Sequence, residues 1–378
     1  MGTSGIIAGA DALRINLVAA VDPSMPRASG ITTYVISLAR ELSLLGQQVR
    51  VLGLGSGGGT IPNVEFIPVT GHIRNSAEFV WALARFLRRR REIDGIVHAQ
   101  RPDDLLAFHF RCEFLPKVVT LHGVHGVHVA ARRGPAAAAL YRLAERYSLR
   151  RTDAILCVSP ATLNHFQHCY PHLAGRLRMI PAGIDTRIFK VQNTQAARRL
   201  LGFPEDGKLI AFVGRFEPEK RPDWVLDEFR SLRRSHSDVR LVMIGEGSMA
   251  GALRGKLSTS GDPVSLQSSV PQDVLARYLG ASDLLVVASR HEGLPTVALE
   301  AMACGTPVVA WPVGILPDIV KSRVNGFIAH SEHEFRALIE EALYETSWMR
   351  EQCGASVAMF GWEKIAPAIL EVYREISS

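Results

Sequence analysis

Short apolar runs alternate with amphipathic stretches along the whole chain. In the first half the apolar runs stand at 14–21, 49–54, 95–99, 118–121, 154–158 and 177–180. An amphipathic stretch at 32–45 follows the first run and ends at Gly46. Strands that alternate with helices predict parallel βαβ units, and strands that are apolar throughout predict a sheet covered on both faces. The pattern therefore predicts an α/β fold.

The same alternation begins again after a polar stretch at 191–199. Its apolar runs stand at 209–213, 240–244, 284–288 and 307–310. The chain has 378 residues, which is more than one hydrophobic core usually holds. We therefore predict a first domain of residues 1–188 and a second of residues 189–360, with the linker in the polar segment 185–195. Ligands of such domains bind at the carboxyl ends of the strands, so we expect a site in a cleft between the two domains.

Composition narrows the class of protein. Hydrophobic residues make up 47% and charged residues 21%, which is typical of a globular chain. No apolar run is long enough to span a bilayer, and residues 1–10 lack the pattern of a signal peptide, so we expect a cytoplasmic protein. Five scattered cysteines predict reduced thiols and neither a disulfide framework nor a zinc site. The net charge of +6 favours an anionic partner: a phosphorylated small molecule, an anionic lipid or a nucleic acid.

The most informative segment is 290–309, which joins two apolar runs. Pro295 stands where a helix would begin, and proline suits the first turn of a helix. Gly305 stands where that helix would end, because glycine adopts the conformation that terminates helices. The segment therefore predicts a strand, a tight turn and a helix over 296–303 that leads into the next strand.

Two carboxylates bracket the start of this predicted helix. Glu292 lies in the turn before it, and Glu300 lies just over one turn inside it. A carboxylate accepts two hydrogen bonds from a vicinal diol, such as a ribose or a sugar presents. The backbone N–H groups near Thr296 and Val297 would form an anion site at the positive end of the helix dipole. The alternative is that Glu292 is only a turn acid and Glu300 only a solvated helix position.

A basic segment, 213–220, follows the first strand of the second domain. Arg215 stands just past the strand end, and Lys220 follows a proline turn. Two cations at one cleft edge suit a diphosphate, since arginine offers a bidentate fork and lysine a point charge. The alternative is a surface ion pair of Arg215 with Glu217 or Glu219.

These segments carry a family resemblance. The stretch E-G-L-P-T-V-A-L-E-A-M-A-C-G-T-P-V-V, with G-R-F-E-P-E-K before it, resembles the retaining GT-B glycosyltransferases of family 4 and group 1, whose marker is two glutamates separated by seven residues. The match extends to P-A-G-I-D-T-R-I-F, V-T-L-H-G and S-G-I-T-T-Y-V. The resemblance implies the GT-B fold, in which two Rossmann-like domains face a cleft. It also implies that the last helix, within 361–378, crosses back to the first domain.

The resemblance implies roles for matching residues. Glu292 would approach the donor sugar, and His122 would lie beside that sugar. Glu300 would bind the ribose, and Arg215 with Lys220 would hold the diphosphate. Further donor contacts would come from Gly30, Gly293, Leu294, Thr296 and Val297. Without its motif, His122 would be interpreted as a hydrogen-bonded histidine at a strand end.

The implied reaction transfers a hexose, with retention of configuration, from a UDP- or GDP-sugar to a hydroxyl group. The acceptor would be a lipid, a growing glycan or a small polyol. We expect no metal ion and no other cofactor, because two cations and a helix dipole already meet the leaving group and no Asp-x-Asp site is present. Two alternatives stay open: a nucleotide-sugar epimerase on the same scaffold, and a basic nucleic-acid-binding protein. No motif that combines aromatic and basic residues supports the second alternative.

Some positions depart from the family pattern. Ser29 precedes Gly30 in place of a second glycine, and Ser268 replaces a glycine expected near the nucleobase, so the base preference is open. Ile315 and Asp318 replace a glycine and a glutamate. A glycine-rich loop at 245–251 lies between a strand and a helix, as a nicotinamide loop does, but no acidic residue at the end of a following strand supports that interpretation.

The stretch 79–91 predicts a basic amphipathic helix. Its apolar face holds Phe79, Val80, Leu83 and Phe86, and five arginines lie beyond that face. Such a helix can lie on an anionic membrane, which would place the protein peripherally at the inner membrane face. The alternative is a helix that packs on the core and carries arginines at its negative C-terminal end.

Overall fold

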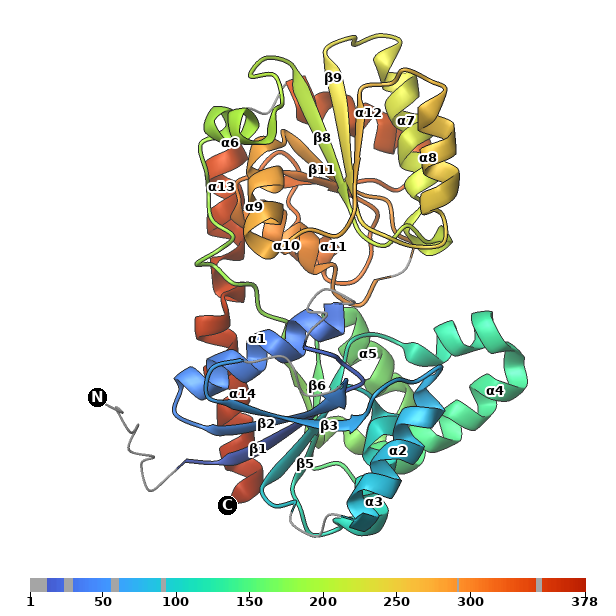
Figure 1. Cartoon of the computed structure of the whole chain (residues 1–378), viewed down its shortest axis with the longest axis vertical. Helices are drawn as coiled ribbons and strands as arrows, with labels where there is room; N and C mark the ends of the chain where they lie inside the picture. The colour runs from blue at the N-terminus through green and yellow to red at the C-terminus, as the bar shows by residue number, and fades with distance from the viewer. Residues whose placement is uncertain (1–11, 24–29, 56–60, 90–92, 291, 345–348) are drawn as a thin grey trace. The chain divides into compact units, whose positions relative to one another are not determined.

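The chain forms two compact α/β units. The computed structural model describes residues 12–23, 30–55, 61–89, 93–290, 292–344 and 349–378. The first unit consists of Met1–Gly183 with Trp362–Ser378, and the second of Ile184–Gly361. Each unit has its own sheet of parallel strands with helices on both faces (Figure 1). The predicted parallel α/β architecture is thus confirmed in both units.

The sheet of the first unit has the strand order β3-β2-β1-β4-β5-β6-β7. Its strands are β1 Arg14–Val18, β2 Gln48–Leu54, β3 Val64–Thr70, β4 Ile96–Ala99, β5 Lys117–Leu121, β6 Ala154–Cys157 and β7 Leu177–Met179. All the predicted strands are present, and β1 is shorter than expected. The sequence pattern missed β3, because this edge strand buries only Ile67 and so lacks a continuous apolar run.

Helices α1 and α14 cover one face of this sheet, and α2, α3 and α4 lie on the other (Figure 1). The helical elements are α1 Gly30–Leu44, α2 Ser76–Arg89, η1 Pro102–Leu105, α3 Leu106–Arg111, α4 His125–Leu149, α5 Pro160–Cys169, η2 Pro171–Arg176 and α14 Trp362–Ser377. Within α4, Gly134 has φ 81° and ψ 175°, outside the helical region, so the helix is kinked just before Pro135.

Helix α2 packs its apolar face into the core of the unit. Phe79 and Leu83 are fully buried, so for these residues the core-packing alternative holds. The outer face exposes Trp81, and the Arg85 guanidinium lies 5.6 Å from the centre of the Trp81 ring. Residues 90 and 91 of the predicted arginine cluster lie outside the described residues. Peripheral contact with an anionic membrane stays a prediction, and none of the helices in the described ranges has the length and apolarity to span a bilayer.

The sheet of the second unit has the strand order β10-β9-β8-β11-β12-β13. Its strands are β8 Lys208–Val213, β9 Val239–Ile244, β10 Val264–Gln267, β11 Leu284–Val287, β12 Val308–Ala310 and β13 Gly326–Ile328. The four predicted strands form the centre of the sheet. The two edge strands, β10 and β13, were not predicted, since the first is only half-buried and the second has three residues.

Helices of the second unit also cover both faces of its sheet (Figure 1). They are α6 Thr194–Leu201, η3 Pro218–Lys220, α7 Pro222–Arg233, α8 Ala250–Ser258, α9 Gln272–Ala281, α10 Thr296–Ala303, α11 Leu316–Ile319, α12 Glu332–Tyr344, α13 Met349–Val357 and η4 Ala358–Phe360. Segment 185–195 leads directly into α6, whose start is capped by the side chain of Asn193.

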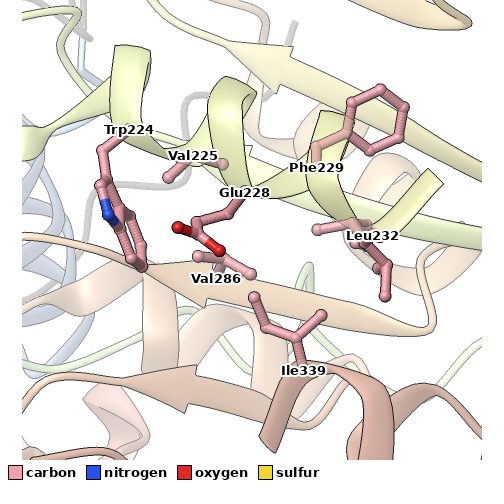
Figure 2. Close-up of a pocket in the computed structure, with 8 residues that line it drawn as sticks. Trp224, Val225, Glu228, Phe229, Leu232, Val286 and Ile339 are labelled. Carbon is pink, nitrogen blue, oxygen red and sulfur yellow. The ribbon is translucent and has the colours of Figure 1, made fainter. Parts of the chain in front are cut away.

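A small pocket lies between α7, α12 and the sheet of the second unit (Figure 2). Its lining is apolar except for Glu228, whose carboxylate points among Trp224, Val225 and Ile339. Arg336 of α12 donates to both oxygens of this carboxylate, at 2.7 and 3.0 Å. The bidentate pair neutralises the buried acid and joins α7 to α12. The pocket is therefore a packing feature with too few polar groups to recognise a nucleotide.

A chain of buried polar groups joins α14 to the centre of the first sheet. The hydroxyl of Tyr373 lies 2.5 Å from Nδ1 of His98, and Nε2 of the same ring lies 2.7 Å from the Thr120 hydroxyl. That hydroxyl lies 3.4 Å from the hydroxyl of Tyr34 on α1. Both nitrogens of the buried imidazole thus have partners, as the interior of a protein requires.

Replacing Tyr373→Phe should destabilise the first unit by about 1–3 kcal/mol, because Nδ1 of the fully buried His98 would lose its partner. Hydrogen exchange of peptides from β4, β5 and α14 under increasing urea measures this free energy for the first unit alone. Tyr147→Phe, at a half-buried tyrosine of α4, is the matched control and should have a smaller effect. Equal protection in Tyr373→Phe and the control would contradict the prediction.

Acid should destabilise the first unit through His98 and His122. Burial lowers the pKa of His98 to about 3, and burial together with the nearby His125 and His98 lowers the pKa of His122 to about 3. An unfolded histidine has a pKa near 6.5, so the full stability is present above about pH 6.5. As the pH falls from 6.5 toward 3, both histidines are protonated in the unfolded chain but stay neutral in the folded chain. The free energy of unfolding therefore decreases by up to about 1.4 kcal/mol per pH unit for each histidine.

The pH dependence can be assigned with His98→Asn, whose amide does not titrate. The free energy of unfolding should fall less between pH 7.5 and pH 5.0 in this variant than in the wild type. Comparing two pH values within each protein removes any constant loss caused by the substitution itself. The same pH dependence in both proteins would show that His98 does not contribute.

Candidate active site

The second unit gathers predicted site residues on two loops at the carboxyl edge of its sheet. Lys220 ends η3 after β8, and Glu292 follows β11. The Lys220 ammonium group forms an ion pair with a carboxylate oxygen of Glu292, although the two residues are 72 positions apart. Ser289 donates its hydroxyl to the same oxygen at 2.8 Å. The two loops therefore place a cation and a carboxylate side by side where parallel strands end.

Arg215 lies on the first of these loops and pairs with a glutamate. Its guanidinium donates to Glu219 at 3.0 Å and is 51% exposed. The backbone carbonyl of Glu219 accepts the N–H of Arg290 from the second loop, also at 3.0 Å. The predicted surface ion pair is thus present, but such an exposed pair contributes little stability, so the guanidinium can exchange Glu219 for a phosphate at small cost.

Helix α10 begins at Thr296 and ends at Ala303, as predicted. Pro295 precedes it, and no side chain caps its start. Thr296 and Val297 are half-buried at the end where the helix dipole is positive, which suits an anion. The N–H of Thr296 donates to the carbonyl of Leu294 at 3.0 Å, so an anion there would have to replace this bond, and the anion site stays a prediction.

Glu300 is buried inside α10. Its exposed fraction is 8%, so the alternative of a solvated helix position is wrong. Burial, with the nearby Glu300 carboxylate as the next cause, raises the pKa of the Cys304 thiol to about 12. A carboxylate can accept hydrogen bonds from a vicinal diol such as a ribose presents.

Close backbone packing explains two glycines at this edge. At Gly314, which has φ +59°, a Cβ atom would come within 2.6 Å of the carbonyl oxygen of Gly293. At Gly247 a Cβ atom would come within 2.5 Å of the carbonyl oxygen of Phe216. The loop at 245–251 therefore has glycine because it packs against the loop after β8, and this packing accounts for the pattern without a nicotinamide cofactor.

In the first unit, His122 directly follows β5 and Gly30 begins α1. Nε2 of His122 lies 2.9 Å from Oε1 of Gln100, the residue after β4. The edge of the Tyr34 ring packs against the imidazole, with ring centres 4.8 Å apart. Because an amide oxygen only accepts, Nε2 carries the proton and Nδ1 is left as an acceptor. Burial lowers the pKa of His122 to about 3, so the imidazole is neutral at pH 7 with its proton on Nε2.

The structure thus brings together part of what the sequence singled out. Lys220 and Glu292 are in direct contact, and Arg215 reaches the same loops through Glu219. Gln100, Ser289 and Tyr34 were missed. Gln100 stands directly after a buried strand, as His122 does, so its position at a strand end is a signal that could have found it. Tyr34 is buried like any core residue, and no sequence signal separated it from the core.

Comparison with known proteins now defines the family. Residues 28–188 match the model described as Glycosyltransferase Family 4, and residues 193–357 match Glycosyl transferases group 1. The D-inositol 3-phosphate glycosyltransferase of Segniliparus rotundus is 32% identical over 273 residues, which are 69% of this chain and 61% of that relative.

Solved structures agree with the family models. Sucrose-phosphate synthase from Thermosynechococcus elongatus superposes with a TM-score of 0.81 at 22% identity, over 97% of this chain and 99% of that one. The Anabaena protein HepE in complex with UDP-glucose superposes with a TM-score of 0.76 at 18% identity, over 96% of this chain and all of that one. The chain belongs to the glycosyltransferases of group 1 and family 4-like type and has their GT-B fold.

Proposed function

We propose that this glycosyltransferase moves a hexose from a UDP- or GDP-sugar to a hydroxyl group, with retention of the anomeric configuration. The contact of Lys220 with Glu292, at the carboxyl edge beside the start of α10, carries the proposal. The solved HepE complex with UDP-glucose and the relative named for D-inositol 3-phosphate support a nucleotide-sugar donor and a hydroxyl acceptor. The family favours transfer over the epimerase alternative.

On the donor side, Arg215 and Lys220 bind the diphosphate. Both cations are paired with carboxylates in the structure, so the incoming phosphates compete with Glu219 and Glu292. When Lys220 turns to the diphosphate, Glu292 loses its cation but keeps the hydroxyl of Ser289. Its second oxygen then accepts from the hydroxyls of the sugar. Donor binding thereby orients the carboxylate that approaches the sugar.

The remaining donor contacts come from α10 and the turn before it. The backbone of Gly293, Leu294, Thr296 and Val297 meets the donor at the positive end of the helix dipole. Glu300 accepts the hydroxyls of the ribose. Gly30 and His122 of the first unit supply the further contacts to the donor that the family resemblance implies.

In the chemical step, the bond between the anomeric carbon and the phosphate oxygen breaks. The acceptor oxygen attacks from the same face, and its proton moves to an oxygen of the leaving diphosphate. The charge that develops on this diphosphate is stabilised by Arg215, Lys220 and the helix dipole, so the proposal needs no metal ion. His122 holds the sugar through hydrogen bonds as a neutral imidazole.

Lys220→Ala should reduce kcat/KM by about two orders of magnitude, because it removes a charged contact of about 3 kcal/mol with the leaving group. The measurement is nucleoside-diphosphate release from UDP-, GDP- and ADP-glucose, after thermal shifts with UDP, GDP and ADP identify the preferred base. Lys256→Ala, at an exposed lysine of α8 in the same unit, is the control and should be as active as the wild type. Full activity of Lys220→Ala would show that the diphosphate binds elsewhere.

Glu300→Gln should weaken binding of the preferred nucleoside diphosphate by about 1.5–3 kcal/mol, the usual contribution of hydrogen bonds to a charged group. Calorimetry with the ribonucleotide and its 2′,3′-dideoxy analogue assigns the contact. The wild type should lose affinity for the analogue, whereas Glu300→Gln should bind both nucleotides equally. A variant that still prefers the ribonucleotide as strongly as the wild type does would rule out the ribose role. Glu351→Gln, an exposed acid of α13, is the control.

A further inference from the structure

Arg221, the residue after Lys220, has a backbone conformation that is unusual for an arginine. Its φ is 55° and its ψ is 46°, in the left-handed region, where a Cβ atom comes too close to the backbone. This one residue joins η3 to α7. Glycine adopts the left-handed region without a steric penalty, so an arginine at this position requires contacts that offset the strain.

The side chain of Arg221 makes such contacts. Its guanidinium lies 4.5 Å from the centre of the Trp224 ring and 5.9 Å from the centre of the Trp311 ring. It also forms an ion pair with Glu332, the first residue of α12. Only 14% of the Arg221 side chain is exposed. The tryptophan rings and the carboxylate both stabilise this largely buried cation.

The rings that contact the guanidinium belong to a packed aromatic cluster. Trp224, Trp311 and the fully buried Phe335 have ring centres 5.0 to 6.1 Å apart. Trp224 comes from α7, Trp311 directly follows β12, and Phe335 comes from α12. Trp224 also lines the small pocket of Figure 2, so its ring is fixed by the core. The aromatic cluster therefore anchors Arg221 to three elements of the second unit.

The anchored residue is linked to both loops of the candidate site. The N–H of Arg221 donates to the carbonyl of Pro218 at 3.3 Å and so closes the turn that carries Lys220. The N–H of Trp311 donates at 3.3 Å to the last carbonyl of β11, the strand that precedes Glu292. The contact between Arg221 and the Trp311 ring thus connects the loop of the cation with the loop of the carboxylate.

We propose that Arg221 is a positioning residue for Lys220: its left-handed backbone, held by the tryptophan rings and Glu332, fixes the lysine where the diphosphate of the donor binds. This inference rests on the proposed function, in which Lys220 binds that diphosphate. A lysine side chain is flexible, so a fixed backbone reduces the entropy that is lost when its ammonium group binds a phosphate. Arg221 acts through Lys220 and needs no contact with the donor.

A double-mutant cycle of Arg221→Gly and Lys220→Ala tests this role. Glycine keeps the left-handed conformation accessible but removes the guanidinium, so the backbone beside Lys220 loses its anchor. Calorimetry with the preferred nucleoside diphosphate should show about tenfold weaker binding for Arg221→Gly than for the wild type. In the Lys220→Ala background, the same substitution should change the affinity less than twofold, because the lysine through which it acts is absent. Wild-type affinity of Arg221→Gly, or equal losses in both backgrounds, would overturn the proposal.

Arg323→Gly is the matched control for a general structural effect. Arg323 also has a left-handed backbone, with φ 61°, and donates to Glu341 of α12 at 2.6 Å. It precedes β13 and so lies at the edge of the sheet opposite the candidate site. This variant should bind the nucleotide as the wild type does. A loss of affinity as large as that of Arg221→Gly would contradict the positioning role.

Glu332→Ala tests the anchor from its exposed end and keeps the proposal testable if Arg221→Gly does not fold. The side chain of Glu332 is 60% exposed, so its removal leaves the core intact. The affinity for the nucleoside diphosphate should fall about threefold when Lys220 is present and stay unchanged in the Lys220→Ala background. The same affinity change in both backgrounds, including no change, would contradict the proposal.

The single variant Lys220→Ala separates this inference from the proposed function. If Lys220→Ala binds the nucleoside diphosphate as tightly as the wild type, the diphosphate binds elsewhere and the proposed function fails at this contact. If Lys220→Ala binds more weakly but the effects of the two substitutions simply add, only the positioning role of Arg221 fails.

Discussion

Polar side chains inside a parallel strand that is covered on both faces are buried, as His98 of β4 and Thr120 of β5 are, so side chains that can meet a ligand stand where such a strand ends. Both sheets of this chain obey that constraint, since β4, β5, β11 and β12 are buried along their whole length. The functional candidates stand directly beyond such strands: Gln100 and His122 in the first unit, and the loops of Lys220 and Glu292 in the second. The positions of the candidate functional residues thus follow from the burial of the parallel strands on both faces.

The two units differ in the charge they present at these edges. In the second unit, Arg215 and Lys220 each pair with a carboxylate, which in our proposal is replaced by a diphosphate. In the first unit, Arg101 pairs with Asp103, and Oδ2 of the buried Asp104 has no hydrogen-bond partner among the described residues.

His122 shows how a catalytic candidate depends on distant packing. Its imidazole contacts Gln100 and the ring of Tyr34. The Tyr34 hydroxyl lies beside that of Thr120, which in turn contacts His98. His98 contacts Tyr373 of α14. Tyr373 is 275 residues from His98 along the chain. The orientation of His122 therefore rests on an element at the opposite end of the sequence.

The sequence by itself determined the alternation of strands and helices, the start and end of α10, and the strand-end positions of His122, Arg215 and Glu292. Apolar periodicity, proline and glycine act locally, so a pattern of neighbours suffices for them. The half-exposed edge strands β3 and β10 lack that pattern. Only the tertiary structure decided that Glu300 is buried, that Lys220 pairs with Glu292, and that Tyr373 pairs with His98. These features join residues that are distant along the chain, and such contacts arise only when separate elements pack.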